Sequence, residues 1–152
     1  MSERRAYSRF VFQDIARFRT QLYDQLIAEH GLTTSQAGVL LTLYGRDAQI
    51  QSELAATMRI GTVTLGGLVD RLEARGLVTR KPVPGDRRAN LVCLTDAARA
   101  LEENLKNRAE EIDIISLSGI PESQEQAFRD MIHKVRDNLS TALAERRALN
   151  GK

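Results

Sequence analysis

Three glycines in the segment RIGTVTLGGLVDRLEARGLVTR, residues 59–80, have nearly the spacing of a phosphate-binding loop. Gly61 and Gly66 fit the pattern Gly-x-x-x-x-Gly, and Gly67 follows directly. A nucleotide-binding loop of the Walker type continues with Lys and then Ser or Thr, because the ammonium group contacts the terminal phosphates and the hydroxyl holds magnesium. Gly67 and Leu68 stand at those two positions here. The sequence therefore argues against a nucleotide site, and a small nucleotide hydrolase is an alternative that rests on the glycines alone.

The other side chains that could do chemistry form no catalytic or metal-binding cluster in the sequence. His30 and His133 are far apart, and neither belongs to a plausible set of ligands or bases. The carboxylate pairs 102–103 and 110–111 lie on predicted helices, where adjacent residues do not share a face. Cys93 is the only cysteine, so no internal disulfide can form. We therefore expect no enzyme activity, no metal and no cofactor.

Charge is unevenly distributed along the chain, although the net charge is only +2. Between residues 59 and 90 there are seven positive side chains against three negative ones, namely Arg59, Arg71, Arg75, Arg80, Lys81, Arg87 and Arg88 against Asp70, Glu73 and Asp86. The segment from Asp96 onward leans acidic. Such asymmetry indicates a basic docking surface on a nearly neutral molecule, with a merely solvated face as the alternative.

Apolar periodicity predicts a mainly α-helical chain with one small β-hairpin. Helices are expected over residues 8–29, 33–45, 51–58, 62–76, 96–118 and 121–149, and β-compatible runs at 77–80 and 91–95 flank a turn at 82–86. The two short helices at 51–58 and 62–76, separated by a break at 59–61, form a helix-turn-helix. The hairpin follows it directly, as the wing of a winged helix-turn-helix.

Small and polar side chains cover one face of the predicted helix at 62–76. On a helical wheel Leu65, Leu68 and Leu72 point inward, whereas Val63, Gly67, Asp70 and Ala74 point outward, with Thr64 and Arg71 beside them. A helix in the major groove needs such a face, since bulky side chains would hold it off the bases. Thr62 and Thr64 could bond phosphates or base edges, Val63 could touch a thymine methyl, and Arg71 could reach a phosphate. For the two threonines, N-capping is the alternative role.

Gly66 and Gly67 are unfavourable in a helix interior, where each lowers stability by roughly 1 kcal/mol relative to alanine. We expect a compensating close approach of the helix backbone, either to DNA or to another helix.

In the predicted hairpin, the segment Gly85-Asp86-Arg87-Arg88 places two guanidinium groups at or beside the tip. Such groups can enter a narrow and electronegative minor groove, and Asp86 can pair with an arginine to hold the tip in shape. An exposed turn without a role is the alternative. Its position beside a helix-turn-helix favours DNA binding.

The long first helix and the last two helices carry apolar stripes that the central module is too small to cover. A second copy related by a twofold axis would cover the remainder, so a homodimer is expected. No apolar run approaches the roughly 18 residues needed to span a bilayer, and the N-terminus MSERRAYSRF is charged. We therefore expect a cytoplasmic protein without membrane contact.

The segment LVDRLEARGLVTRKPVPGDRRANLVCLTDAA, residues 68–98, resembles the MarR family of winged helix-turn-helix transcriptional regulators. The most specific features are Asp86-x-Arg88 in the wing, Leu94-Thr95 after it, and the run LExxGLV at 72–78 before it. Helix order and length agree over residues 8–147. The resemblance implies a single protomer over residues 1–152, with a winged helix-turn-helix at 33–95 and dimerisation helices at 8–30 and 97–147.

The resemblance also implies that residues 62–71 enter the major groove, that Arg88 probes the minor groove and that Asp86 orients the wing. The expected DNA-binding residues are Thr62, Val63, Thr64, Gly66, Gly67, Arg71, Asp86, Arg87 and Arg88. Family members often have an arginine or another polar residue where the two glycines stand. Base recognition would therefore depend more on residues 62–64 and on DNA shape.

Many family members bind small aromatic or phenolic anions between the dimer helices and the winged module, so such an effector is compatible with this chain. Its binding residues stay unassigned. Tyr23, His30 and Tyr44 lie near that region, but tyrosines near helix ends are more often packing residues. Peroxide-sensing members use a cysteine near the start of the first helix, so Cys93 is not expected to act as a thiol switch.

Together these features predict a homodimeric repressor that binds a palindromic operator on double-stranded DNA. The alternative is a winged-helix dimer that binds a protein partner and has weakened DNA binding. The two glycines and the outward position of Asp70 are the reasons for keeping this alternative.

Overall fold

The computed structural model describes residues 3–83 and 85–150, and within them the side chains of residues 10–83, 85–86 and 89–149. The chain divides into two compact units, Met1–Asp113 and Ile114–Lys152. Among the described residues, no helix combines the length and apolar character that crossing a lipid bilayer would require.

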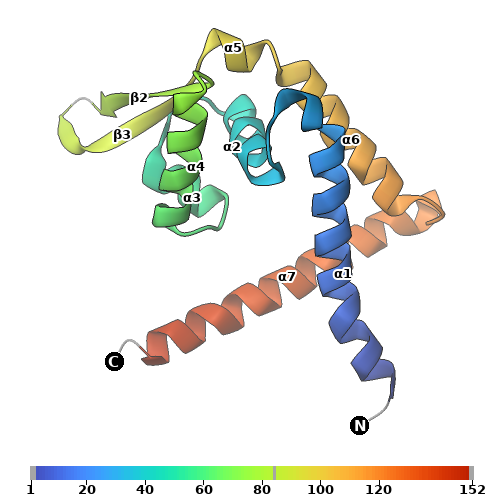
Figure 1. Cartoon of the computed structure of the whole chain (residues 1–152). Coiled ribbons are helices and arrows are strands. Elements are labelled where there is room, and N and C mark those ends of the chain that lie inside the picture. Colours follow the sequence, from blue (N-terminus) through green and yellow to red (C-terminus); the bar gives the residue numbers. More distant parts are fainter. Residues whose placement is uncertain (1–2, 84, 151–152) are drawn as a thin grey trace. The chain divides into compact units, whose positions relative to one another are not determined.

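The element order confirms a mainly helical fold with a small sheet (Figure 1). In the first unit the elements are α1 (Glu3–Leu26), η1 (Ala28–His30), α2 (Thr34–Gly45), β1 (Gln49–Ile50), α3 (Gln51–Thr57), α4 (Thr62–Ala74), β2 (Val78–Val83), β3 (Asp86–Leu94) and α5 (Asp96–Arg99). Helix α6 (Glu102–Leu117) leads into the second unit, whose main element is α7 (Glu122–Asn150).

Polar caps and glycines set the ends of the central helices, as the sequence predicts. At the start of α2 the Thr33 hydroxyl accepts a hydrogen bond from the Gln36 backbone N–H, and the Thr33 N–H donates to Gln36 Oε1 at 2.9 Å. This reciprocal pair is a capping box, which satisfies two backbone donors that a helix start leaves open. Gly31 and Gly76 follow the ends of η1 and α4 with φ of +59° and +67°, a conformation that favours glycine.

The three-stranded antiparallel sheet has the order β1-β3-β2 and is larger than the predicted hairpin. Strand β2 includes Pro82 and Val83, which the sequence assigns to a turn, and its register against β3 shifts between them. Proline is tolerated there because β2 is an edge strand. Strand β1 was not predicted, because two residues carry no detectable periodicity; it pairs Gln49 with Val92 and Ile50 with Leu91.

Two predicted helices have different limits in the structure. The first begins at Glu3 instead of residue 8 and ends at Leu26, with the separate turn η1 after it. The helix predicted from Asp96 to about 118 is interrupted after Arg99. There the carbonyl of Ala98 accepts the Tyr44 hydroxyl at 2.6 Å and the Leu101 N–H at 3.0 Å, so local and long-range bonds together bend the chain.

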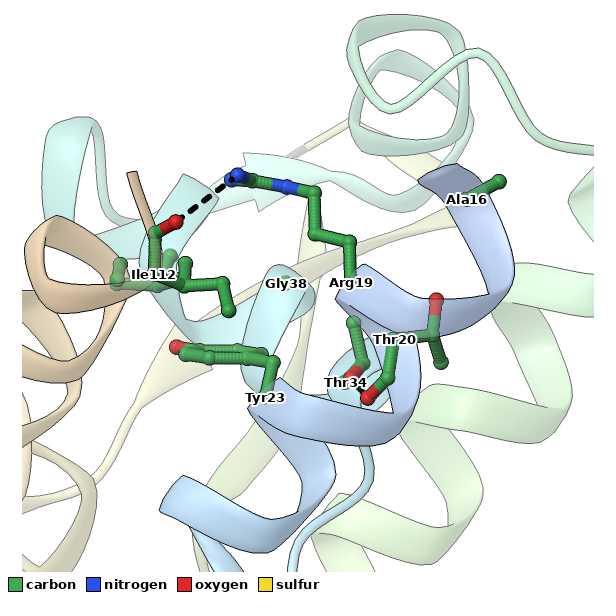
Figure 2. Close-up of a pocket in the computed structure, with 9 residues that line it drawn as sticks. Ala16, Arg19, Thr20, Tyr23, Thr34, Gly38 and Ile112 are labelled. Carbon is green, nitrogen blue, oxygen red and sulfur yellow. Dashed lines mark hydrogen bonds between the residues drawn. The ribbon is translucent and has the colours of Figure 1, made fainter. Parts of the chain in front are cut away.

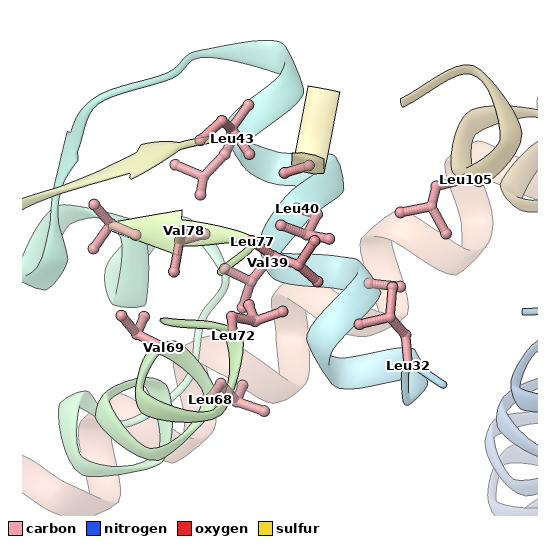
Figure 3. Close-up of a cluster of buried hydrophobic side chains, with 14 of the residues drawn as sticks. Leu32, Val39, Leu40, Leu43, Leu68, Val69, Leu72, Leu77, Val78 and Leu105 are labelled. Carbon is pink, nitrogen blue, oxygen red and sulfur yellow. The ribbon is translucent and has the colours of Figure 1, made fainter. Parts of the chain in front are cut away.

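The core of the first unit lies between α2, α4 and the sheet. Figure 3 shows Leu68, Val69 and Leu72 of α4 pointing toward Val39 of α2 and Val78 of β2. All five side chains are at most 5% exposed. Each buried aliphatic side chain contributes roughly 1.5–3 kcal/mol of transfer free energy, so this contact holds the helix-turn-helix in place.

In the second unit, α7 is a helix of 29 residues that begins after Pro121. Gly119, with φ of +83°, makes the turn that precedes it. Large apolar side chains along α7 are exposed, among them Met131, Ile132, Leu139, Leu143 and Leu149.

Candidate nucleic-acid interface

The turn between α3 and α4 has a regular helix-ending conformation. Arg59 adopts a positive φ of 56°, and the Ile60 N–H donates to the Ala55 carbonyl at 3.1 Å. Leu54 and Ala55 of α3 are buried and anchor this side of the turn. The structure therefore confirms the predicted helix-turn-helix, with its break at residues 59–61.

The outer face of α4 is exposed, as the helical wheel predicts. Val63 is 89% exposed, and Thr62, Thr64, Asp70 and Arg71 are exposed as well. Gly61 is the N-cap of the helix, and no side chain of the N-cap residue accepts a hydrogen bond from the first backbone N–H groups. N-capping at that position is therefore not the role of the two threonines, whose hydroxyls stand on the first turn of an exposed helix.

Gly66 and Gly67 are half-buried on this helix, yet neither is required by packing within the protomer. A Cβ atom added to Gly66 would lie 3.7 Å from Nε2 of Gln51, and one added to Gly67 would lie 3.9 Å from Nη2 of Arg71. Both are ordinary van der Waals distances. Tight helix packing inside the protomer, one of the two expected explanations, is thus excluded.

Arg80 of β2 links α4 to the sheet and to α3. Its guanidinium donates to Asp70 Oδ1 at 2.6 Å, to Glu73 Oε2 at 2.6 Å and to Gln51 Oε1 at 3.0 Å, and lies 3.4 Å from the Gly66 carbonyl. Burial lowers the pKa of Arg80, but the hydrogen bonds to Asp70 and Glu73 more than offset this, so its pKa lies above the ordinary value. Arg80, which the sequence counts among the docking charges, is used inside the protomer.

Arg75 also has a structural role. Its two terminal nitrogens donate to the carbonyls of Gly31 and His30, each at 2.6 Å, and so tie the end of α4 to the segment that follows α1. Of the described basic side chains predicted to form a docking surface, Arg59, Arg71, Arg75 and Lys81 are exposed and Arg80 is half-buried. Two of these side chains, Arg75 and Arg80, are thus hydrogen-bonded within the protomer.

The three expected wing residues lie at the start of β3. Asp86 is exposed and pairs with Val83 in the sheet, directly after Gly85 with its φ of +84°. The backbone of Arg87 and Arg88 belongs to β3, but their side chains lie outside the described part of the structure.

A cavity of about 340 Å³ lies among α1, α2 and α6, within the first unit. Its lining consists of Ala16, Arg19, Thr20, Tyr23, Thr34, Gly38, Leu41, Ala109 and Ile112. Figure 2 shows the Arg19 side chain reaching across to the Ile112 carbonyl, to which it donates at 3.4 Å. Arg19 also contacts Asp113 Oδ1 at 2.5 Å, so one cation links α1 to α6 beside the cavity.

Tyr23 lines this cavity, whereas Tyr44 and His30 are packing residues. The Tyr23 hydroxyl donates to the Leu105 carbonyl at 3.3 Å, and His30 Nε2 lies 2.8 Å from Asn104 Oδ1. Burial raises the pKa of Tyr23, opposed by the charge of Arg19, and burial raises the pKa of Tyr44 to about 12. Both hydroxyls are therefore protonated hydrogen-bond donors at neutral pH.

The sequence did not identify Arg19 and Arg80 as residues that link separate elements of the fold. Arg19 is one of several arginines on α1, and its partner Asp113 is far away in sequence. For Arg80, the only sequence signal was the pair of carboxylates at Asp70 and Glu73, three positions apart on one helix, which creates a place for a cation.

Comparison with known proteins shows that the chain is similar to DNA-binding transcriptional regulators. A sequence profile described as "MarR family" matches residues 30–89. The HTH-type transcriptional repressor NicR of Pseudomonas putida is 30% identical over 119 residues, which are 78% of this chain and 75% of NicR.

Two solved structures with related sequences share the fold. One, of BpsR from Bordetella bronchiseptica, concerns regulation of its DNA binding by 6-hydroxynicotinic acid; it has a TM-score of 0.78 at 28% identity, covering 84% of this chain and 91% of BpsR. The other, CouR from Rhodococcus jostii bound to p-coumaroyl-CoA, has a TM-score of 0.71 at 26% identity, covering 83% and 88%.

Replacing Arg80 by methionine is expected to lower the free energy of unfolding by about 1–3 kcal/mol, because Asp70 and Glu73 lose their shared cation. Urea denaturation followed by circular dichroism measures this change. Arg71→Met, at an exposed position on α4, is the control that removes the same charge outside this cluster, and it should change stability by less than about 0.5 kcal/mol. Equal losses in the two variants would contradict the assigned role of Arg80.

Proposed function

This chain belongs to the MarR family of winged helix-turn-helix transcriptional regulators, and from that premise we propose that it is a homodimeric repressor of a palindromic operator, released by a small aromatic acid. The observation that carries the proposal is the exposed face of α4, which presents small and polar side chains opposite a buried apolar stripe. In this proposal α4 enters the major groove, and the tip of the β2–β3 hairpin contacts the adjacent minor groove.

The proposed contacts on α4 are Thr62, Val63 and Thr64 to base edges and Arg71 to a phosphate. Asp86 orients the wing, and Arg87 and Arg88 supply its positive charge. Electrostatic attraction to phosphates positions such a protein on the duplex, whereas the base-edge contacts select the sequence.

Exposed apolar side chains on two helices support a dimer. On α1, Val11, Ile15 and Phe18 follow each other at helical spacing and are 47%, 50% and 56% exposed. On α7, Leu139 and Leu143 are 66% and 52% exposed. Contiguous apolar faces of this kind are usually covered, and a second copy related by a twofold axis would place two recognition helices about 34 Å apart, one turn of DNA.

The alternative of a protein-binding module without DNA affinity loses one of its two reasons. Asp70 faces outward, but its carboxylate is bound by Arg80, so the outer face of α4 carries no uncompensated acidic group at that position. The glycines that gave the other reason are equally compatible with close approach to DNA.

The proposed effector site is the cavity among α1, α2 and α6. Its volume of about 340 Å³ suits a molecule with one aromatic ring. Leu41, Ala109 and Ile112 offer apolar contact, and Arg19 offers a cation for a carboxylate. BpsR and CouR supply the support from relatives, since their solved structures concern 6-hydroxynicotinic acid and p-coumaroyl-CoA.

A bound carboxylate would compete with Asp113 for the guanidinium of Arg19. At present Arg19 links α1 to α6 through Asp113 and the Ile112 carbonyl. Withdrawal of this cation from α6 would change how the two helices are held, and through them the spacing of the recognition helices in a dimer. Release from DNA then follows from differential affinity of the acid for the two arrangements.

Replacing Arg88 by alanine is expected to weaken operator binding by roughly 1–3 kcal/mol, the scale of one groove contact. Fluorescence anisotropy measures affinity for DNA from upstream of the protein's own gene and for a scrambled duplex, at several salt concentrations. For the unmodified protein, log K should fall by about 0.9 per phosphate contact for each unit of log salt. Lys106→Ala on α6 serves as the charge control. Unchanged affinity of the Arg88→Ala variant would remove Arg88 from the interface.

Replacing Arg19 by glutamine is expected to weaken binding of aromatic acids roughly 10–100-fold, because a charge-assisted hydrogen bond is lost. Calorimetric titration with 6-hydroxynicotinate and 4-hydroxybenzoate measures the change. Arg17→Gln is the matched control: Arg17 lies on the same helix but pairs with Asp14 at 2.6 Å and does not line the cavity. If both variants bind the acids as the unmodified protein does, the cavity is not the effector site.

A further inference from the structure

Val63 is an unusual residue for the surface position that it occupies. With 89% of its surface exposed, it is the most exposed large apolar side chain in the described part of the chain. It stands on the first turn of α4, between the hydroxyls of Thr62 and Thr64, which are exposed too. An isolated surface valine needs no explanation by itself. This one lies on the face that the family membership assigns to DNA.

Val63 has two glycines as its neighbours on the surface of α4. Gly66 and Gly67 lie three and four residues further along α4, at the positions whose side chains would stand next to Val63 on a helix. Among the described residues nothing requires either glycine, since alanine would meet only ordinary contacts at both. Each costs the helix roughly 1 kcal/mol relative to alanine. The two positions beside Val63 therefore lack a side chain of their own at the expense of helix stability, and the nearest side-chain atoms there belong to Gln51 and Arg71.

A short apolar side chain that is flanked by glycines can contact one particular group on the major-groove edge of a base pair. Thymine carries an apolar C5 methyl group there, whereas the other recognition groups of that edge are hydrogen-bond donors and acceptors. A valine methyl can touch it only if the helix backbone comes close to the base, because valine is short. Side chains at positions 66 and 67 would oppose that approach.

Resting on the proposed function, we propose that Val63 reads the C5 methyl group of a thymine in each operator half-site, and that Gly66 and Gly67 permit the approach. The operator should thus contain a half-site thymine that no other base replaces without loss.

The test uses the full chain and an operator selected from a random duplex pool. Each thymine of the operator is replaced in turn by deoxyuridine, which pairs in the same way and lacks only the methyl group. At one thymine per half-site, the replacement is expected to weaken binding about fourfold, the value of one buried methyl group of ~0.8 kcal/mol. Val63→Ala should bind the thymine operator more weakly and show no further loss with deoxyuridine.

Thr64→Ala is the matched control, since it alters the same turn but keeps Val63. It should retain the fourfold penalty for deoxyuridine. An equal penalty in Val63→Ala, or no penalty at any thymine in the unmodified protein, would overturn the assignment while leaving operator binding intact. Failure to enrich any duplex would instead contradict the proposed function itself.

The glycines give a second, independent measurement. Gly67→Ala is expected to unfold at a higher urea concentration than the unmodified protein, because alanine favours the helix and has room there. The same variant should bind the operator at least fivefold more weakly, since its Cβ atom stands between the helix and the bases. A variant that is more stable and binds equally well would refute the close approach.

Discussion

The rest of the structure depends on one constraint on α4: this helix must bury one face and expose the opposite one. One face must be buried, and Leu65, Leu68, Val69 and Leu72 are all at most 5% exposed. The other face is exposed, and in the proposed complex it must stay open for contact with a duplex. A helix of 13 residues has little stability alone in water, so its orientation is determined by packing against α2 and the sheet. The buried stripe thereby decides which side chains a partner can meet.

Arginines complete this arrangement in two different ways. Arg75 and Arg80 are bonded within the protomer, at the end of α4 and along its side, and they hold the helix against its neighbours. Arg80 also pairs with Asp70 and Glu73, so in the proposed complex these carboxylates of α4 need not repel phosphates. The charge that a duplex meets is thus set by which guanidinium groups are already occupied. Segment net charge alone overstates it.

Local signals explain what the sequence could predict. The limits of α2 follow from Thr33 and Gly45, and the orientation of α4 follows from its leucine spacing, because both depend on residues within a few positions of one another. Other features depend on residues that only the fold brings together. They are the pairing of β1 with β3, the interruption after Arg99, and the hydrogen bonds of Arg80 and Arg19. No periodicity encodes such contacts, so the sequence could not predict the cavity or the hydrogen bonds of Arg80 beside α4.

The glycines of α4 show where helix stability and surface shape conflict. If they served flexibility, the helix should be interrupted at them, yet α4 is continuous from Thr62 to Ala74 and neither glycine has a positive φ. Their effect is therefore on the surface of a regular helix. The loss of roughly 1 kcal/mol at each is offset by buried leucines and valine on the opposite side, each contributing about 1.5–3 kcal/mol. Burial on the inner face thus allows the helix to keep glycine at both positions.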